Sequence, residues 1–382
     1  MKRIHILSLV LIVSFSLSGL SQTKVQKDYY IPGVSTRVGD PLPSTGAQQD
    51  LPEIVNVAPV AHDVLCLEID ACRIIPGRQI PYTAESGDVI REGGTTGLGE
   101  VRHIFVTRDG FPLGTLVGEG RRTLALYERI AGEHLDTGAA GKADSYLISS
   151  AGDSNFADGV RPRKVYRKSR PSGWTDSSWQ LSRNQTYTGR HYIYLVLPAP
   201  LKTGQVYKIN VSGLNVSRSS VIYVHDPVMV RSEAVHSSQL GFRADDPDKN
   251  AFLSVWLGDG GSYSYPEDIE FWLVDEKTNK KVFTGRAVMQ WRSNMPEGIG
   301  TKANHVGTDL MRLDFSSFST PGKYRVCVDG IGCGYPFDID EESTWKHAFG
   351  LAMKGLFILR SGIPLGPPFT DFVRPRVFHP DD

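Results

Sequence analysis

Three aromatic residues in one polar stretch of the sequence are the side chains best suited to bind a ligand. Trp174, Trp179 and Tyr187 lie within residues 150–190, a long stretch rich in glycine and polar residues. Exposed aromatic rings stack on the apolar faces of sugars, because they offer a large contact area at low entropic cost. We therefore expect either a carbohydrate-binding surface here or rings that hold a long surface loop against the fold.

Four cysteines form two pairs with the same spacing. Cys66 and Cys72 are six positions apart, and so are Cys327 and Cys333. Residues 328–332 have the composition of a hairpin turn, so facing strand positions can bring the second pair of sulfurs together. Their even number favours the disulfides Cys66–Cys72 and Cys327–Cys333. The alternative is four small buried hydrophobic residues, because closing a short loop stabilises little.

No motif in the sequence supplies catalysis or holds a cofactor. There is no Gly-x-Ser-x-Gly sequence for a serine nucleophile. Glycine runs at 93–94, 97–99 and 118–120 lack the Lys-Ser/Thr ending of a phosphate loop. Neither cysteine pair has the spacing of a zinc site. We therefore expect no catalytic residue, no cofactor and no metal in this chain.

The charge balance excludes partners that are recognised by bulk electrostatics. Lys and Arg total 42, and Asp and Glu total 42, so the formal net charge is zero. We expect no binding to nucleic acid or to an anionic membrane. A neutral polysaccharide is compatible with this composition.

The N-terminus has the pattern of an export signal. Lys2 and Arg3 precede an apolar run from Ile6 to Leu17, which is short for a membrane span. Gly19-Leu20-Ser21 then places small residues at a cleavage site. We interpret Met1–Ser21 as a cleaved signal peptide. We expect a secreted or periplasmic protein that is not held in a membrane after cleavage, and an oxidising environment for its cysteines.

The sequence up to about residue 340 predicts two β-sandwich domains. Residues 22–50 are rich in Pro, Gly, Ser and Thr and are expected to be a linker. Residues 51–229 and 230–340 each contain short strand-like runs with frequent turns. Expected strands of the first domain are Val64–Ile69, Val101–Thr107, Leu124–Ile130, Tyr146–Ser149, Tyr192–Leu197, Val206–Val211 and Val221–His225. Two polar insertions, 84–100 and 150–190, are expected to be surface loops. Tyr324, just after Pro321-Gly322, is expected to bond the backbone as a tyrosine corner does.

The pattern changes to one strongly apolar helix near the end of the sequence. Ser343 is a suitable N-cap, and Gly362-Ile363-Pro364 ends the pattern. The helix is apolar nearly all round in its second half, so it must be buried, usually among other helices. No partner helix occurs elsewhere in the sequence. Residues 341–382 are therefore expected to be the start of a further domain.

An ordered series of residues gives the second sandwich and the helix a specific resemblance. The series contains Gln239-Leu240-Gly241-Phe242, Pro247-Asp248-Lys249, Phe271-Trp272-Leu273-Val274-Asp275, Asp309, Pro321-Gly322-Lys323-Tyr324 and Tyr335-Pro336-Phe337. It resembles the immunoglobulin-like module that precedes the catalytic domain in glycoside hydrolase family nine, the endoglucanases or cellulases. The helix resembles the first helix of that family's (α/α) barrel. The resemblance covers roughly residues 230–382, and Ser238 departs from it, because the family usually has Asn there.

This resemblance implies a mainly β fold, with two sandwiches, the second immunoglobulin-like, and one helix of an incomplete (α/α) barrel. The family's catalytic Asp-Ala-Gly-Asp motif does not occur in the 382 residues, and its late Glu would lie further on. Inverting glycosidases need two carboxyl groups, and neither can be assigned here. The resemblance thus implies an accessory part of an enzyme that acts on β-1,4-glucan, inactive by itself. The alternative is a stand-alone secreted protein that binds polysaccharide or another protein through its sandwiches.

Overall fold

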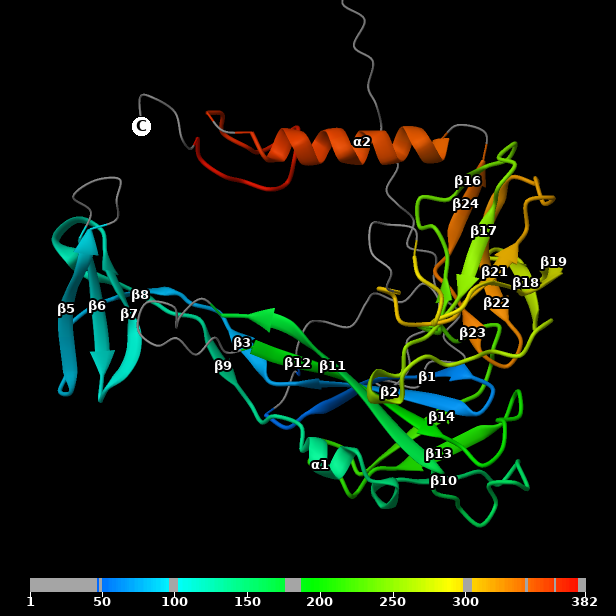
Figure 1. The fold of residues 1–382 in the computed structure, drawn as a ribbon. Coiled ribbons are helices and arrows are strands. Elements are labelled where there is room, and N and C mark those ends of the chain that lie inside the picture. The colour runs from blue at the N-terminus through cyan, green and yellow to red at the C-terminus, as the bar shows by residue number, and fades with distance from the viewer. Residues whose placement is uncertain are drawn as a thin grey trace, which may run out of the picture. The chain divides into compact units, whose positions relative to one another are not determined.

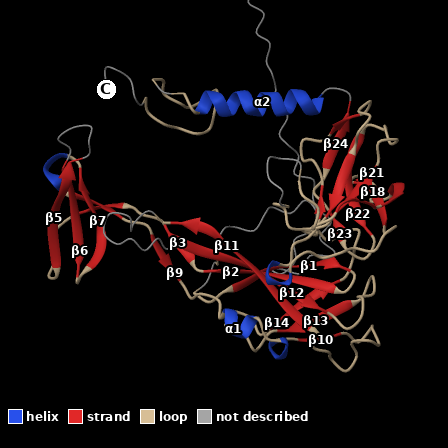
Figure 2. Cartoon of the chain, in the orientation of Figure 1, coloured by secondary structure: helices blue, strands red, loops and turns tan. Residues whose placement is uncertain are grey.

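The structure, a computed structural model, describes residues 47, 50–95, 102–175, 187–297, 304–340, 343–360 and 362–376. Strands dominate these residues, and the long helix α2 (Ser343–Ile358) follows the last strand (Figure 2). The predicted fold class, a mainly β protein with one C-terminal helix, is confirmed. A second, short helix, α1 (Thr137–Ala140), lies within the first sandwich region.

The first sandwich consists of a four-stranded and a three-stranded antiparallel sheet (Figure 1). The larger sheet has the order β1 (Glu53–Ala61), β2 (Val64–Ala71), β12 (Tyr187–Val196) and β11 (Lys164–Trp174). The smaller sheet has the order β10 (Leu147–Ser149), β13 (Val206–Asn210) and β14 (Ser220–Val224). Leu67, Ile193 and Tyr207 lie in the apolar core of this sandwich and are fully buried. Every residue of β2 is buried, because the larger sheet is covered on both faces.

The segment between β2 and β10 forms a separate five-stranded antiparallel sheet. Its order is β4 (Gln79–Pro81), β8 (Thr123–Leu126), β7 (Phe111–Val117), β6 (Arg102–Arg108) and β5 (Asp88–Thr95). A two-stranded ladder of β3 (Arg73–Ile75) and β9 (Arg129–Ala131) leads into and out of it. The strand expected at Leu124–Ile130 is therefore divided between β8 and β9.

The prediction of two long surface loops was wrong in part. β5 lies inside the 84–100 insertion, and β11 lies inside the 150–190 insertion. Both strands have polar residues on both faces, so neither shows the alternation by which a half-buried strand is recognised. Their backbones pair with β6 and β12 regardless of side-chain polarity.

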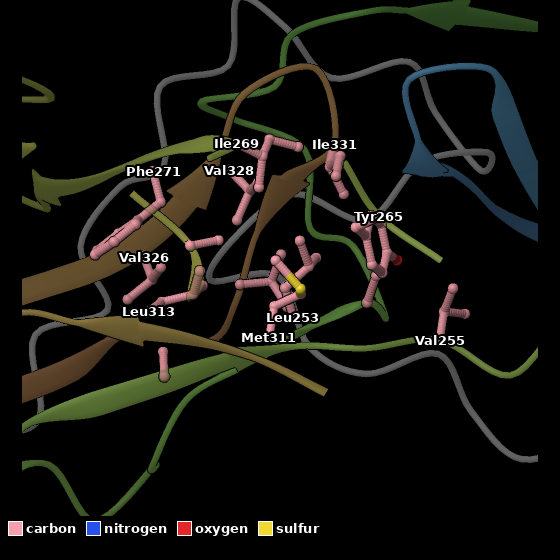
Figure 3. Packing of buried hydrophobic residues seen from close by; sticks show 14 of the residues in the cluster. Leu253, Val255, Tyr265, Ile269, Phe271, Met311, Leu313, Val326, Val328 and Ile331 are labelled. Carbon is pink, nitrogen blue, oxygen red and sulfur yellow. The ribbon is translucent and has the colours of Figure 1, made fainter. Parts of the chain in front are cut away.

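The second sandwich packs two sheets around a large aromatic and aliphatic core (Figure 3). One sheet has the order β15 (Val235–His236), β17 (Asn250–Leu253), β21 (Leu310–Asp314) and β20 (Val288–Trp291). The other has the order β16 (Phe242–Arg243), β24 (Phe337–Asp340), β22 (Gly322–Val328), β18 (Glu270–Asp275) and β19 (Lys281–Arg286), and β23 (Gly332–Cys333) also pairs with β22. Figure 3 shows Leu253, Met311 and Val326 pointing into this core from three different strands. The expected tyrosine corner is confirmed, because the Tyr324 hydroxyl donates to the Pro321 carbonyl at 3.3 Å.

The two cysteine pairs differ in the structure. Cys327 and Cys333 are facing residues of β22 and β23 and are joined by a disulfide. The expected Cys66–Cys72 disulfide is not formed, and both thiols are free and buried. Cys66 lies within strand β2 and Cys72 directly follows its end. Six extended residues span about 20 Å, whereas disulfide-bonded Cα atoms lie roughly 4.4–6.8 Å apart.

Helix α2 presents its apolar side chains to solvent. Phe349 is 67% exposed and Leu356 is 61% exposed. Among the described residues, Phe369 is the one aromatic residue whose ring contacts the ring of Phe357. The burial expected from the apolar pattern is therefore not seen in this chain. A stand-alone protein predicts burial of the helix either against the second sandwich or at an oligomer interface, and the first of these does not occur among the described residues. No helix in the described residues is long and apolar enough to cross a membrane.

The larger sheet of the first sandwich contacts the second sandwich through one shared core. Val60, Cys66 and Tyr194 belong to the same apolar cluster as the core residues of the second sandwich. Ser232 donates to the Pro59 carbonyl at 2.7 Å, and Tyr265 donates to the Val60 carbonyl at 2.7 Å. The two sandwiches are thus joined by apolar packing and by direct hydrogen bonds.

Candidate functional site

Two of the three aromatic residues singled out in the sequence lie side by side on the surface. Trp174 ends β11, Tyr187 begins β12, and the two are direct cross-strand partners. Their ring centroids are 5.8 Å apart, and the ring planes are tilted by 54°. Trp174 is 57% exposed and Tyr187 is 46% exposed. Trp179 lies outside the described residues.

Just before Trp174, the backbone of β11 passes close to side chains of neighbouring strands. The β11–β12 register shifts between Pro171 and Gly173. A side chain at Gly173 would meet the Ile74 Cδ1 atom at 2.9 Å and the Thr188 hydroxyl at 3.0 Å. Only glycine fits between these atoms without displacing them. The Ser172 and Thr188 hydroxyls are hydrogen-bonded at 2.8 Å and join β11 to β12 next to the Trp174–Tyr187 pair in the sequence.

A buried ion pair supports β12 two residues further along. Arg190 Nε and Nη2 donate to the two carboxylate oxygens of Asp70, both at 2.7 Å. The pKa of Arg190 is raised, first by this hydrogen bonding and then by the nearby negative charges. The pair locks the end of β12 onto β2. Sequence analysis did not select either residue, although a charged residue inside an otherwise apolar strand is a signal for such a pair.

The titratable groups near the rings are not arranged for acid–base catalysis. Desolvation, with nearby Arg167, lowers the pKa of His191 to about 4, so its imidazole is neutral at pH 7. Its Nδ1 atom is 2.8 Å from the Ser169 hydroxyl. The Cys72 Sγ atom is 3.5 Å from His134 Nδ1, but burial raises the pKa of this thiol and disfavours the thiolate. His191 and Cys72 are therefore each in contact with a polar neighbour and are uncharged at pH 7.

The geometry of the two rings suits contact with an apolar ligand face. Both rings lie on the same side of the sheet, because cross-strand partners share a face. Both rings are about half exposed, so part of each ring surface is open to a ligand. In the described parts of the chain, no three His, Cys, Asp or Glu side chains are grouped as a metal site. The arrangement of the two rings is thus suited to binding by stacking.

A comparison with family models gives one match in the second sandwich. Residues 231–333 match the model described as the cellulase N-terminal Ig-like domain. This range contains the disulfide and most strands of the second sandwich, but not β24, which contributes Phe337 and Ile339 to the core. Among curated proteins, none is similar enough to this chain to match.

Several solved structures share similarity over about a third of the chain. A metagenome-derived glycoside hydrolase family 9 endoglucanase is 19% identical, with a TM-score of 0.30, over 37% of this chain and 24% of its own. A glycoside hydrolase family 9 protein of Bacteroides ovatus is 23% identical, with a TM-score of 0.28, over 37% of this chain and 22% of its own. AaCel9A, solved with cellobiose-like isofagomine, is 16% identical, with a TM-score of 0.24, over 35% of this chain and 20% of its own.

This chain therefore spans about a quarter or less of the length of the solved structures that it matches. The matched family model and the ordered motif residues lie in the same module. Residues 231–333 are thus similar to the cellulase N-terminal Ig-like domain, and the rest of the chain is not covered by this match.

Proposed function

We propose that this chain is the accessory part of an exported family-nine glycoside hydrolase that acts on β-1,4-glucan. The Ig-like module supports the (α/α) barrel in this proposal, and hydrolysis needs residues that the 382-residue sequence does not contain. The observation that carries the proposal is the exposed apolar helix α2, which follows directly after the Ig-like module. An apolar surface of this kind marks an interaction site.

Extension of the coding region tests this proposal. The region beyond the Asp382 codon is sequenced in all three frames and searched for an Asp-Ala-Gly-Asp motif. The chain and its extended form are then assayed on carboxymethylcellulose. We expect hydrolysis by the extended form only. Hydrolysis by the 382-residue chain, or an extended form without the motif and without activity, would contradict the proposal.

The exposed helix face gives an independent test. In the purified chain, the double substitution Phe349→Gln and Leu356→Gln should lower binding of a hydrophobic dye several-fold and reduce self-association. Thermal unfolding of the β-sandwiches should not change, because both side chains are more than half exposed. In the extended protein the same substitutions should lower the melting temperature, since both side chains would then be buried. Equal behaviour in the two proteins would contradict docking of a barrel on α2.

Trp174 and Tyr187 are proposed to contact the polysaccharide. In affinity electrophoresis on soluble glucans, Trp174→Ala and Tyr187→Ala should each weaken retardation by roughly tenfold, which corresponds to about 1.4 kcal/mol. Trp179→Ala tests the third ring. Trp256→Ala is the matched control, because Trp256 is 46% exposed but lies in the Ig-like module. Unchanged mobility of the Trp174 and Tyr187 variants would end this part of the proposal.

Export is proposed from the pattern of Met1–Ser21. N-terminal sequencing of the protein recovered outside the cytoplasm should begin at Gln22. A retained Met1 on exported protein would contradict a cleaved signal peptide. The stand-alone binding protein remains the second candidate function, favoured by the exposed ring pair. It takes precedence if the extended gene encodes no catalytic motif and the ring variants lose glucan binding.

A further inference from the structure

A cleft on the Ig-like module is lined by residues that belong neither to the aromatic pair nor to helix α2. It has a volume of about 460 Å³, and its walls include His236, Phe242, Asp248, Asn250 and Phe252. Small-molecule sites have volumes of roughly 300–1,000 Å³ and combine apolar walls with a few polar groups. The size and the lining therefore both suit a small ligand.

Strand pairing places the aromatic part of the cleft. His236 on β15 and Phe252 on β17 are cross-strand partners and share one face of the sheet. Asn250 lies two residues before Phe252 and points to the same side. Phe242 is held by edge-to-face contacts with Phe315 and Phe337, at centroid distances of 5.3 and 5.4 Å. The apolar walls are thus fixed by the sheet and by the module's own core.

The polar groups of the cleft are mainly hydrogen-bond acceptors. His236 Nε2 is 3.1 Å from the Ser254 carbonyl, which can only accept, so Nε2 carries the proton and Nδ1 is an acceptor. Asn250 Nδ2 donates to the Asp248 carboxylate. Asn250 Oδ1 is buried and has no hydrogen-bond partner among the described residues. A ligand with several hydroxyl donors matches this set.

The charge balance argues against a cationic ligand. Lys249, between Asp248 and Asn250 in the sequence, is almost fully buried. Its Nζ atom donates to the backbone carbonyls of Ala244 and Asp246. Asp248 is the one carboxylate among the residues that line the cleft, and Asn250 Nδ2 already donates to it. A neutral ligand is favoured over an ammonium or guanidinium group.

We propose that this cleft binds one neutral sugar unit, with its apolar face on Phe252 and its hydroxyls donating to Asp248 and to His236 Nδ1. The inference rests on the proposed function for the identity of the sugar, a β-1,4-linked glucose unit. It gives the Ig-like module a ligand contact of its own, in addition to support of a barrel. The relevant chemistry is ring stacking together with hydroxyl-to-carboxylate hydrogen bonds.

Titration calorimetry of the full chain with cellotetraose tests the inference. Phe252→Ala and Asp248→Ala should each weaken binding at least tenfold, and Phe252→Tyr should restore it. Trp256→Ala should bind as the parent chain does. Circular dichroism melting identifies any variant that fails to fold, and Asp248→Ala then serves alone, because Asp248 is exposed. Unchanged affinity in both cleft variants would overturn the inference.

A panel of manno-, xylo- and galacto-oligosaccharides separates the two proposals. Binding of one of these sugars, with sensitivity to Phe252→Ala and without cellotetraose binding, would support the cleft and contradict a β-1,4-glucan substrate. Cellotetraose binding that is lost in Trp174→Ala but kept in Phe252→Ala would overturn the cleft and keep the proposed function. Loss in both variants would support both.

Discussion

The two faces of the sheet β1–β2–β12–β11 are built from different chemistry. The face that carries Leu67 and Ile193 packs on the smaller sheet through aliphatic and aromatic side chains. The opposite face meets the Ig-like module, and there Tyr194 and Cys66 stand among charged groups. Lys168 Nζ lies 3.0 Å from a Glu233 carboxylate oxygen, and the Tyr194 hydroxyl donates to the same carboxylate.

The first face therefore mainly holds the two sheets of the first sandwich together, whereas the second face mainly fixes the orientation of the Ig-like module. Apolar packing is not directional, so the first face can hold its layer without fixing one register by itself. Hydrogen-bonded charged groups tolerate only a narrow geometry, so the second face can define how the module is seated. We therefore expect substitutions to lower the unfolding free energy most where a side chain is buried and paired, and least where it is partly open to solvent.

The largest effect is expected at the buried ion pair next to the ring surface. Asp70→Ala removes the carboxylate to which Arg190 Nε and Nη2 donate and so breaks the buried ion pair. Loss of one member of a buried pair costs about 3–5 kcal/mol of unfolding free energy. Urea denaturation measures this cost. The control is the double variant Asp70→Leu and Arg190→Met, which should recover much of the stability.

A somewhat smaller cost is expected on the apolar face. Ile193 is fully buried, so Ile193→Ala leaves a cavity and should lower the unfolding free energy by about 3 kcal/mol. Ile193→Val is the matched control, with a cost of about 1 kcal/mol. If Ile193→Ala and the parent chain had the same unfolding free energy within error, the neighbouring side chains would be able to fill the cavity at this position.

Stability should fall in acid because of His225. Desolvation lowers the pKa of this buried imidazole to about 4, and its Nδ1 atom lies 3.0 Å from the Tyr223 hydroxyl. The unfolded chain binds the proton near pH 6.5 and the folded chain only near pH 4, so unfolding is favoured as pH decreases across this window. The loss attributable to His225 should approach about 3 kcal/mol at pH 4.

Denaturation at several pH values between 7 and 4 measures this dependence. His225→Gln should give a shallower dependence than the parent chain, while the carboxylates act alike in both. Parallel curves for the two proteins would show that His225 is protonated as easily in the folded chain as in the unfolded one.

The smallest effect is expected at the contact between the sandwiches. Lys168→Ala removes an ion pair that is partly open to solvent, so its cost should be about 1 kcal/mol or less. Added salt should reduce the cost further. Limited proteolysis near Val230 offers a second readout, because weaker seating of the module should expose that segment. If Lys168→Ala lowered the unfolding free energy as much as Asp70→Ala does, the proposed distinction between the buried Asp70–Arg190 pair and the partly open Lys168–Glu233 pair would be wrong.

Strands with clear alternation were predictable from the sequence, and strands without it were not. The run Tyr192–Leu197 marks most of β12, and Val206–Val211 marks β13. β5 and β11 were missed because their residues are polar on both faces and their pairing is decided by the backbone. The spacing of Cys66 and Cys72 suggested a disulfide only because the strand between them was not treated as a rigid spacer.

The candidate site was predictable in composition but not in geometry. Trp174 and Tyr187 were selected as aromatic residues in a polar stretch, yet only the register of β11 and β12 makes them neighbours. The cleft was not predicted at all. His236 and Phe252 are sixteen positions apart, and sequence spacing does not reveal that strand pairing makes them neighbours on one face of the sheet.

The core shared by the two sandwiches has a consequence for how such genes can be recombined. Val60, Cys66 and Tyr194 pack with residues of the Ig-like module, and these three residues lie outside the matched range 231–333. A segment cut at residue 230 and grafted elsewhere would carry only part of that core. The Ig-like domain of this chain is therefore not an interchangeable cassette, and a transplanted copy would need a substitute for the sheet that it leaves behind.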